Sequence, residues 1–235
     1  MASCDDAAPS GPTGSTRCLT WQESGTAVAV QCETDTGQAI TFCGHGLLGA
    51  AHYWQDNGYR PQRLTMSGAA FAYSHESGVG WIGSDAPMLA PAAVPAWTDL
   101  LSGDAPLACV EAGDNAGYLV LEWAEDTDLA GLKPPGGCLQ QHTMRALIAT
   151  CRVSPGNSLA GEDIQLRYFA PQYGVDEDVA TGSAMRVLAS YWHQRGLGDH
   201  LRGLQRSARG GWLFSRFESS RVWVGGVVRR SGATA

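Results

Sequence analysis

Two segments of similar sequence carry residues suited to binding an anion. Residues 42–58 and 180–196 align at a constant offset of 138 residues, and each has a glycine near its start (Gly44 and Gly182) and a Tyr-Trp pair followed by another glycine. Apolar residues at helical spacing, closed by a glycine, predict a helix in each segment. The free N–H groups and the dipole of a helix N-terminus favour negative charge. If the two helix starts face one another, they form a site for a carboxylate.

Short strands are predicted around these helices. Eight stretches are rich in β-branched or aromatic residues and bounded by Gly, Pro, Asp or Asn. They are residues 27–31, 64–67, 70–73, 118–123, 147–152, 165–169, 211–214 and 221–228. We therefore expect an α+β fold of two pseudo-symmetric lobes, each a curled, mostly antiparallel sheet around a central helix. The predicted division is a disordered tail at 1–16, an N-terminal lobe at 17–103 and a C-terminal lobe at 104–235.

Composition excludes several classes of protein. The chain has 235 residues, of which 44% are hydrophobic, so it is long enough to bury a sizeable core. A net charge of −7 gives no driving force for binding nucleic acid or an anionic membrane surface. No run of eighteen apolar residues predicts a membrane span, and the polar start, with Asp5 and Asp6, does not resemble a secretion signal. A cytoplasmic location is expected.

The seven cysteines are scattered and form no CxxC pair. This pattern argues against a zinc site and against a disulfide framework, and it favours buried free thiols in a reducing compartment. The histidines show no metal-ligand spacing either. We expect no metal and no other cofactor.

Two motifs resemble those of the phenazine-biosynthesis PhzF-like family. Residues 42–52 (FCGHGLLGAAH) are similar to its CGHATLAAAH helix, and residues 167–184 (RYFAPQYGVDEDVATGSA) are similar to its RFFAP and GVPEDPATGSA signature. The resemblance covers about residues 42–228. It implies a diaminopimelate-epimerase-like fold and a cofactor-free isomerase, usually a dimer, that moves a proton on a small carboxylate-bearing substrate.

The resemblance implies catalytic roles for Asp178 and His45. Asp178 is suited to act as a general acid/base, although an acidic residue just before a helix also stabilises the helix dipole. His45 opens the first helix and is suited to hydrogen-bond a substrate, with a backbone hydrogen bond as the alternative. Arg167 either binds an anion or pairs with Glu177 or Asp176.

Five further residues are predicted to bind substrate. Gly44 and Gly182 let the chain approach a ligand closely, and Ser183 offers a hydroxyl and an N–H to a carboxylate. Cys43 lies where the diaminopimelate epimerases have a catalytic thiol, whereas the repeat places Thr181 at the matching position. A racemase that uses two thiols is therefore disfavoured.

The family's N-terminal catalytic glutamate has no match before Cys43, and its GNP and NLSE patterns are absent. The first lobe is accordingly expected to be shortened, with a sheet edge that a homodimer covers. Two hypotheses follow. Either the chain is an isomerase whose second proton-transfer group is unidentified, or it is a catalytically silent relative that binds small molecules or serves as a scaffold.

Overall fold

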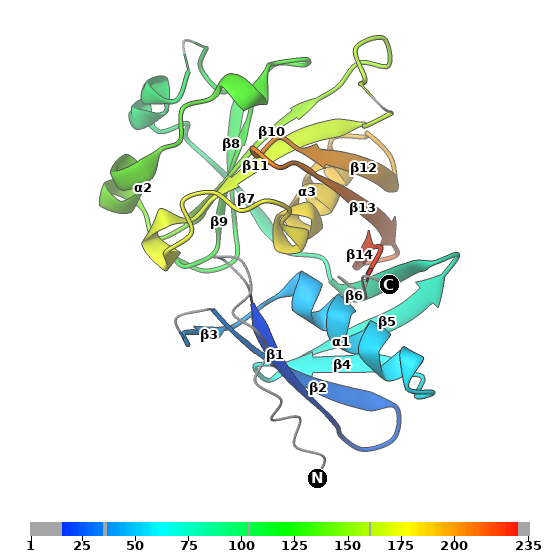
Figure 1. Cartoon of the computed structure of the whole chain (residues 1–235). Helices are drawn as coiled ribbons and strands as arrows, with labels where there is room; N and C mark the ends of the chain where they lie inside the picture. Colours follow the sequence, from blue (N-terminus) through cyan, green and yellow to red (C-terminus); the bar gives the residue numbers. More distant parts are fainter. Residues whose placement is uncertain (1–15, 35–36, 103, 160, 230–235) are drawn as a thin grey trace, which may run out of the picture.

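The computed structural model describes residues 16–34, 37–102, 104–159 and 161–229. The predicted tail therefore lies outside the described residues, apart from Thr16. The described strands form one large, mostly antiparallel sheet that curls first around one helix and then around a second (Figure 1). The fold is α+β with two similar halves, which confirms the predicted fold class.

The first half surrounds helix α1 (Gly44–Asp56). One side of α1, including Leu47 and Ala51, packs against inward-facing strand residues such as Val28 and Leu64. Each large apolar side chain buried in this way contributes roughly 1.5–3 kcal/mol, which holds the helix against its sheet. The strands are β1 (Arg17–Gln22), β2 (Ala27–Glu33), β3 (Ala39–Ile40), β4 (Arg63–Met66), β5 (Ala69–Glu76) and β6 (Val79–Asp85).

The second half surrounds helix α3 (Gly182–Gln194), which is buried on most of its sides. Its strands are β7 (Leu89–Ala92), β8 (Ala108–Ala112), β9 (Tyr118–Glu122), β10 (Ala146–Arg152), β11 (Ile164–Phe169), β12 (His200–Gln205), β13 (Gly211–Glu218) and β14 (Arg221–Gly226). A second core, on the other face of β9–β11, is closed by helix α2 (Gly136–His142) and by the short 3₁₀ helices η1 (Ala96–Leu100) and η2 (Leu129–Gly131). A third 3₁₀ helix, η3 (Pro171–Tyr173), follows β11.

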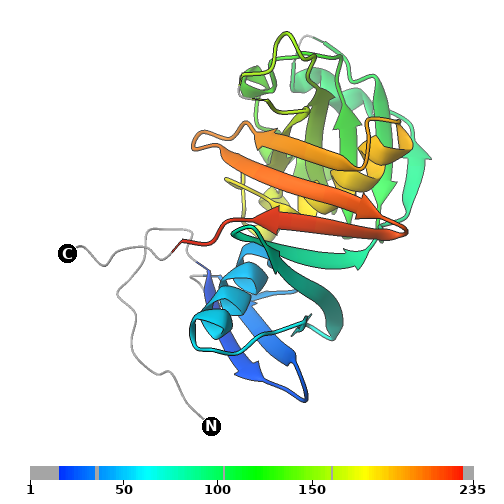
Figure 2. The same ribbon diagram turned by 90° about the vertical axis from the view of Figure 1, so that its right-hand side faces the viewer.

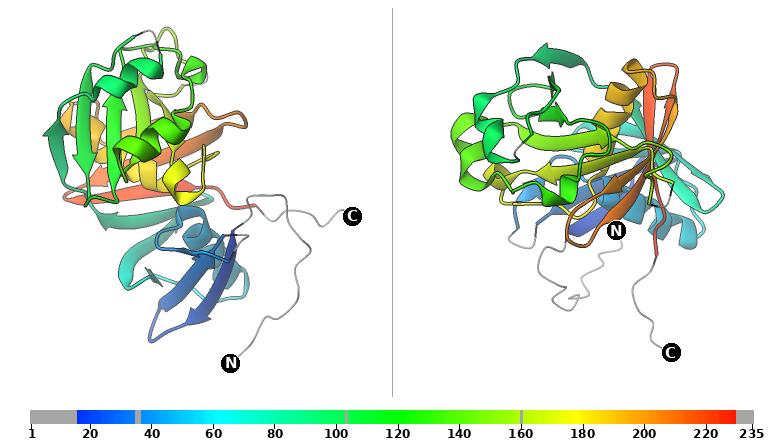
Figure 3. Two further views of the ribbon diagram at one scale, coloured as in Figure 1. Left: turned by 90° about the vertical axis from the view of Figure 1, so that its left-hand side faces the viewer. Right: turned by 90° about the horizontal axis from the view of Figure 1, so that it is seen from above.

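Strands β6 and β14 join the two halves, and Figures 2 and 3 show them side by side at the waist of the molecule. Trp223 lies opposite Gly83, and Trp81 lies opposite Gly225. A Cβ on either glycine would come within 2.8 Å of the facing indole ring, so only glycine leaves room for it. The guanidinium of Arg216 lies 4.7 Å from the ring centre of Trp81 and 5.0 Å from that of Trp223. This packing fixes one half against the other.

The sequence predicted both long helices and eight of the strands, and all ten are present with ends that differ by a few residues. It did not predict β1, β3, β6, β7, β8, β12 or α2. Glycine weakens the β-strand signal of β6 and β12, whereas β1 (RCLTWQ) contains Thr and Trp and was simply missed. The lobe boundary at residue 103 stays a prediction, although the pairing of β7 with β8 joins residues 89–92 to the second half.

The expectation that the chain has no disulfide is wrong. Cys18 and Cys32 are directly opposite each other on β1 and β2, and they form a disulfide that closes a sequence separation of 14 residues. Because β1 was not predicted as a strand, this pairing was not visible in the sequence. Cys43, Cys109, Cys138 and Cys151 are free.

None of the helices in the described ranges is both long enough and apolar enough to cross a membrane.

Candidate functional site

The starts of α1 and α3 meet at the junction of the two halves. A Cβ placed on Gly44 would lie 3.6 Å from the Cα of Gly182, and one placed on Gly182 would lie 3.8 Å from the Cα of Gly44. Both distances are those of ordinary van der Waals contact, so the two helix starts lie directly side by side. The structure thus brings together the two helix starts that the sequence predicted to face one another.

The first N–H groups of both helices are unused. Within the described part of the chain, the N–H groups of Gly44, His45, Gly182 and Ser183 donate no hydrogen bond. Each helix start also carries the positive end of its dipole. Four free donors and two dipole ends in one place make a suitable site for a small anion such as a carboxylate.

Asp178 lies just before α3, half-buried and hydrogen-bonded on both carboxylate oxygens. The Thr181 hydroxyl donates to Oδ2 at 2.7 Å, and the Val179 N–H donates to Oδ1 at 2.8 Å. Thr181 is the N-cap of α3, but its hydroxyl serves the carboxylate and does not cap the helix. These bonds hold the carboxylate in one orientation, which a proton-transfer group requires.

Gln205 on β12 is a functional candidate that the sequence analysis missed. Its side chain is fully buried and accepts a hydrogen bond from the Thr181 N–H at 2.8 Å, while its Nε2 donates to the Asp178 carbonyl at 2.6 Å. One amide thus holds both ends of the segment that carries Asp178. Every second residue of β12 faces the core: Leu201, Gly203 and Gln205. A polar residue in this inward row is the sequence feature that could have identified Gln205.

Cys43 occupies the N-cap of α1 and is buried. Its Sγ accepts a hydrogen bond from the Gly46 N–H at 3.4 Å and lies 3.4 Å from Nε2 of His45, whose ring is exposed. Burial raises the pKa of the Cys43 thiol, the Gly46 N–H partly offsets this, and the negative charge of Asp178 raises it further. The charge of Asp178 therefore acts across the junction on a thiol of the first half.

Arg167 takes the structural alternative rather than the anion-binding one. Its Nε and Nη2 form two hydrogen bonds to the Glu177 carboxylate, at 2.6 and 2.8 Å, and its Nη1 donates to the carbonyl of Leu132. The guanidinium is almost fully buried, so this bidentate pair braces the loop before α3. Both residues of the pair line a cavity of about 480 Å³, and so does Gln205, but none of the seven residues predicted to be catalytic or to bind substrate lines it.

No cluster of three His, Cys, Asp or Glu side chains in the described ranges has the geometry to hold a metal ion.

Two similar half-sheets, each around one helix and with the helix starts in contact, define a two-lobed α+β fold of the diaminopimelate-epimerase-like type. A family model described as "Phenazine biosynthesis-like protein" matches residues 36–213. The chain belongs to this phenazine biosynthesis-like (PhzC-PhzF) family.

Relatives and solved structures agree with this assignment. An uncharacterised isomerase of Pseudomonas aeruginosa is 32% identical over 193 residues, which cover 80% of this chain and 69% of that protein. Phenazine biosynthesis-like domain-containing protein 1 of Mus musculus is 32% identical over 190 residues, which cover 74% of this chain and 65% of that protein. The chain thus matches about two thirds of the length of these relatives.

A PhzF-family protein from Enterococcus faecalis shares the fold, with a TM-score of 0.76 and 21% identity over 90% of this chain and 78% of that one. A hydroxyproline epimerase from Agrobacterium vitis does so at a TM-score of 0.57 and 11% identity, with 89% of this chain and 71% of that one covered. At these identities the likeness concerns the fold.

Proposed function

We propose that the chain is a cofactor-independent isomerase that shifts a proton on a small carboxylate-bearing substrate. The observation that carries the proposal is the contact between the two helix starts, with free N–H groups on both sides and a hydrogen-bonded carboxylate on the segment that leads into one of them. An anion site and a general acid/base are the two parts that such a reaction needs.

In the proposed mechanism, the N–H groups of Gly44, His45, Gly182 and Ser183 bind the substrate carboxylate. Charge that develops on this carboxylate as the neighbouring carbon loses its proton is stabilised by the same donors. Asp178 takes the proton from carbon and returns it at the receiving position. His45 hydrogen-bonds the substrate, and the Thr181 hydroxyl keeps the Asp178 carboxylate oriented.

The solved neighbours suggest which substrates to try. The hydroxyproline epimerase from Agrobacterium vitis was solved with trans-4-hydroxy-L-proline, which has a carboxylate beside the carbon that an epimerase inverts. Amino acids, hydroxy acids and their unsaturated relatives form the corresponding panel for this chain.

A second candidate function is a silent relative that binds small carboxylates without converting them. One observation favours it: within the described residues, the side chains that make contacts at the N-cap of α1 are those of Cys43, His45 and Met66, and no carboxylate is among them. The two functions share the anion site and differ only in whether the proton moves.

The deciding experiment follows binding and proton exchange together. Calorimetry identifies which acids of the panel bind, and NMR in D₂O follows deuterium at their carbon atoms. An isomerase converts an acid that binds, with deuterium at the receiving carbon, and Asp178→Asn abolishes this conversion. Asp176→Asn, an exposed neighbour, is the matched control and should leave conversion unchanged. Binding without conversion or exchange would establish the silent function instead.

We also propose that the chain forms a homodimer that covers β1. This strand is the outer edge of the sheet, and it exposes Leu19 (56%) and Trp21 (48%) on one face. Open edges with apolar side chains are usually covered. Light scattering at micromolar concentration should give twice the chain mass, and Trp21→Lys should lower the measured mass towards that of one chain. A monomeric wild-type protein would rule the dimer out.

A further inference from the structure

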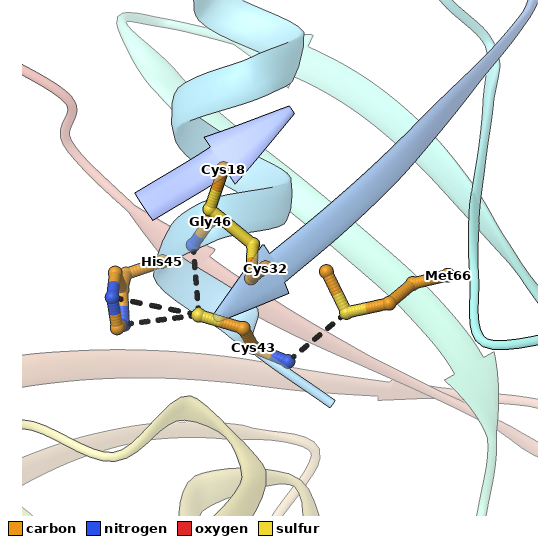
Figure 4. The surroundings of a disulfide bond; sticks show 6 residues. All are labelled: Cys18, Cys32, Cys43, His45, Gly46 and Met66. Atoms are coloured by element: carbon orange, nitrogen blue, oxygen red, sulfur yellow. Dashed lines mark hydrogen bonds between the residues drawn. A yellow bond between two sulfur atoms is a disulfide. The ribbon is translucent and has the colours of Figure 1, made fainter. Parts of the chain in front are cut away.

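Three sulfur atoms converge at the start of α1 (Figure 4). A Cβ on Gly46 would lie 2.4 Å from Sγ of Cys32, 2.7 Å from Sγ of Cys18 and 3.1 Å from Sγ of Cys43. The first two sulfurs are joined in the disulfide, and the third is a free thiol. Glycine at position 46 is what leaves room for all three, so the cluster is built into the helix.

The free thiol has the partners that activate such a group. Both ring nitrogens of His45 lie close to Cys43 Sγ, Nε2 at 3.4 Å and Nδ1 at 3.6 Å, so the imidazole is placed to accept the thiol proton. The Gly46 N–H points at the same sulfur, at the positive end of the helix dipole. Both features favour a thiolate and partly offset burial and the charge of Asp178, which together raise the pKa of the Cys43 thiol.

We propose that Cys43, Cys18 and Cys32 form a thiol–disulfide exchange site in which Cys43 attacks Sγ of Cys32. The Cys43–Cys32 bond forms as the Cys32–Cys18 bond breaks, and Cys18 leaves as a thiolate. The proton given up by Cys43 passes to His45, and Cys18 takes up a proton from solvent as His45 releases its own. The number of disulfides is unchanged, so the step needs no oxidant or reductant.

Solvent exposure sets the direction of attack. Cys18 is exposed, whereas Cys32 is 1% exposed. A thiolate that leaves at Cys18 is hydrated, whereas one that leaves at Cys32 would be charged inside the core. Attack on Cys32, with Cys18 as the leaving group, therefore has the lower cost.

The exchange links the cysteines to the anion site. In the native pairing the bridge joins β1 to β2, whereas in the exchanged pairing it joins β2 to the residue that precedes Gly44. The new bond constrains the helix start that contacts Gly182, while β1 loses its covalent link and presents a thiol to solvent.

Trapping with iodoacetamide tests the exchange on the full-length chain in a Cys4→Ser background. The native protein is alkylated, quenched in acid, digested without reductant and mapped by mass spectrometry. We expect carboxamidomethyl-Cys18 together with a Cys32–Cys43 bridge. Cys109 is the internal control because it is as buried as Cys43, 4% exposed in each case, and has no disulfide beside it. Labelling of Cys18 should be at least on the order of tenfold faster than labelling of Cys109.

Two variants separate exchange from simple exposure. Cys43→Ser should leave Cys18 unlabelled, because no thiol remains to displace it. His45→Gln should slow the labelling of Cys18 several-fold without changing the melting temperature, which a purely structural histidine would not do. An intact Cys18–Cys32 bridge after the half-buried Cys138 is fully labelled would overturn the proposal, whether or not Cys43 itself is labelled.

Discussion

The starts of α1 and α3 are equivalent in backbone and different in chemistry. Both helices have 13 residues, both begin with a glycine, and those two glycines are in contact. Before α1, the side chains around the N-cap are the sulfurs of Cys43 and Met66. Before α3, they are oxygen and nitrogen groups of Asp178 and Gln205.

The difference continues position by position along the repeat. At the same offset of 138 residues, Cys43 matches Thr181 and Gly46 matches Ala184. The parts that suit anion binding are main-chain groups, so both halves keep them. The parts that suit proton transfer are side chains, and these have diverged. The α3 start has the carboxylate of Asp178, and the α1 start has the buried thiol of Cys43 beside a disulfide.

The largest effect is expected from removing the carboxylate on the α3 side. Asp178→Asn keeps the shape and most hydrogen bonds but cannot titrate, so kcat should fall by about 10²–10⁴-fold. Cys43→Ser and His45→Gln on the α1 side should lower kcat less, because an oriented hydroxyl or amide remains at each position. Steady-state kinetics on a converted acid measures all three. Equal losses for Asp178→Asn and Cys43→Ser would mean that both sides transfer protons.

Reducing the disulfide should have the next largest effect, and only on the α1 side. A bridge that closes a loop of this length, with a sequence separation of 14 residues, stabilises by roughly 3 kcal/mol, chiefly by limiting the unfolded chain. Urea unfolding with and without reductant should therefore differ by about this free energy. A Cys18→Ser/Cys32→Ser protein is the control, and its stability should not depend on the reductant.

Position 46 of α1 matches position 184 of α3, and giving each position the other's residue should destabilise the protein, by different amounts. Gly46→Ala places a methyl group 2.4 Å from Cys32 Sγ, so the cluster must shift, at a cost of about 1–3 kcal/mol. Ala184→Gly adds backbone freedom inside a helix and should cost about 0.5–1 kcal/mol plus a lost buried methyl group. Combining Gly46→Ala with Cys32→Ala in a double-mutant cycle should show coupling. Additive effects would mean that the sulfurs do not set the cost at position 46.

The last comparison concerns the side chains that accept a hydrogen bond from the N-cap N–H of each helix, and its smallest expected effect is that of Met66→Leu. Gln205→Leu leaves the buried Thr181 N–H without its acceptor and should cost about 1–3 kcal/mol. Met66→Leu removes a weak sulfur acceptor from the Cys43 N–H at similar volume and should cost less than about 1.5 kcal/mol. Denaturant unfolding of the two variants makes the comparison. A larger loss for Met66→Leu would show that the α1 start is the more tightly held.

The sequence by itself determined the parts of this protein that depend on neighbouring residues. The period of apolar residues in 42–58 and 180–196 predicted both helices, and the shared spacing predicted the repeat. The motif around Asp178 indicated the family. Helical and strand periodicity is written into consecutive side chains, so it can be read without knowing where the rest of the chain lies.

Only the tertiary structure decided the contacts between distant residues. The Cys18–Cys32 bridge depends on the register of two strands, one of which was not predicted from the sequence. The choice of Glu177 as the partner of Arg167 depends on how the loop before α3 folds back onto β11. Gln205 acquires its role only when β12 passes behind Thr181. Such pairings depend on positions set by the whole core, because a side chain's type says what it can bind, whereas packing selects which partner comes within reach.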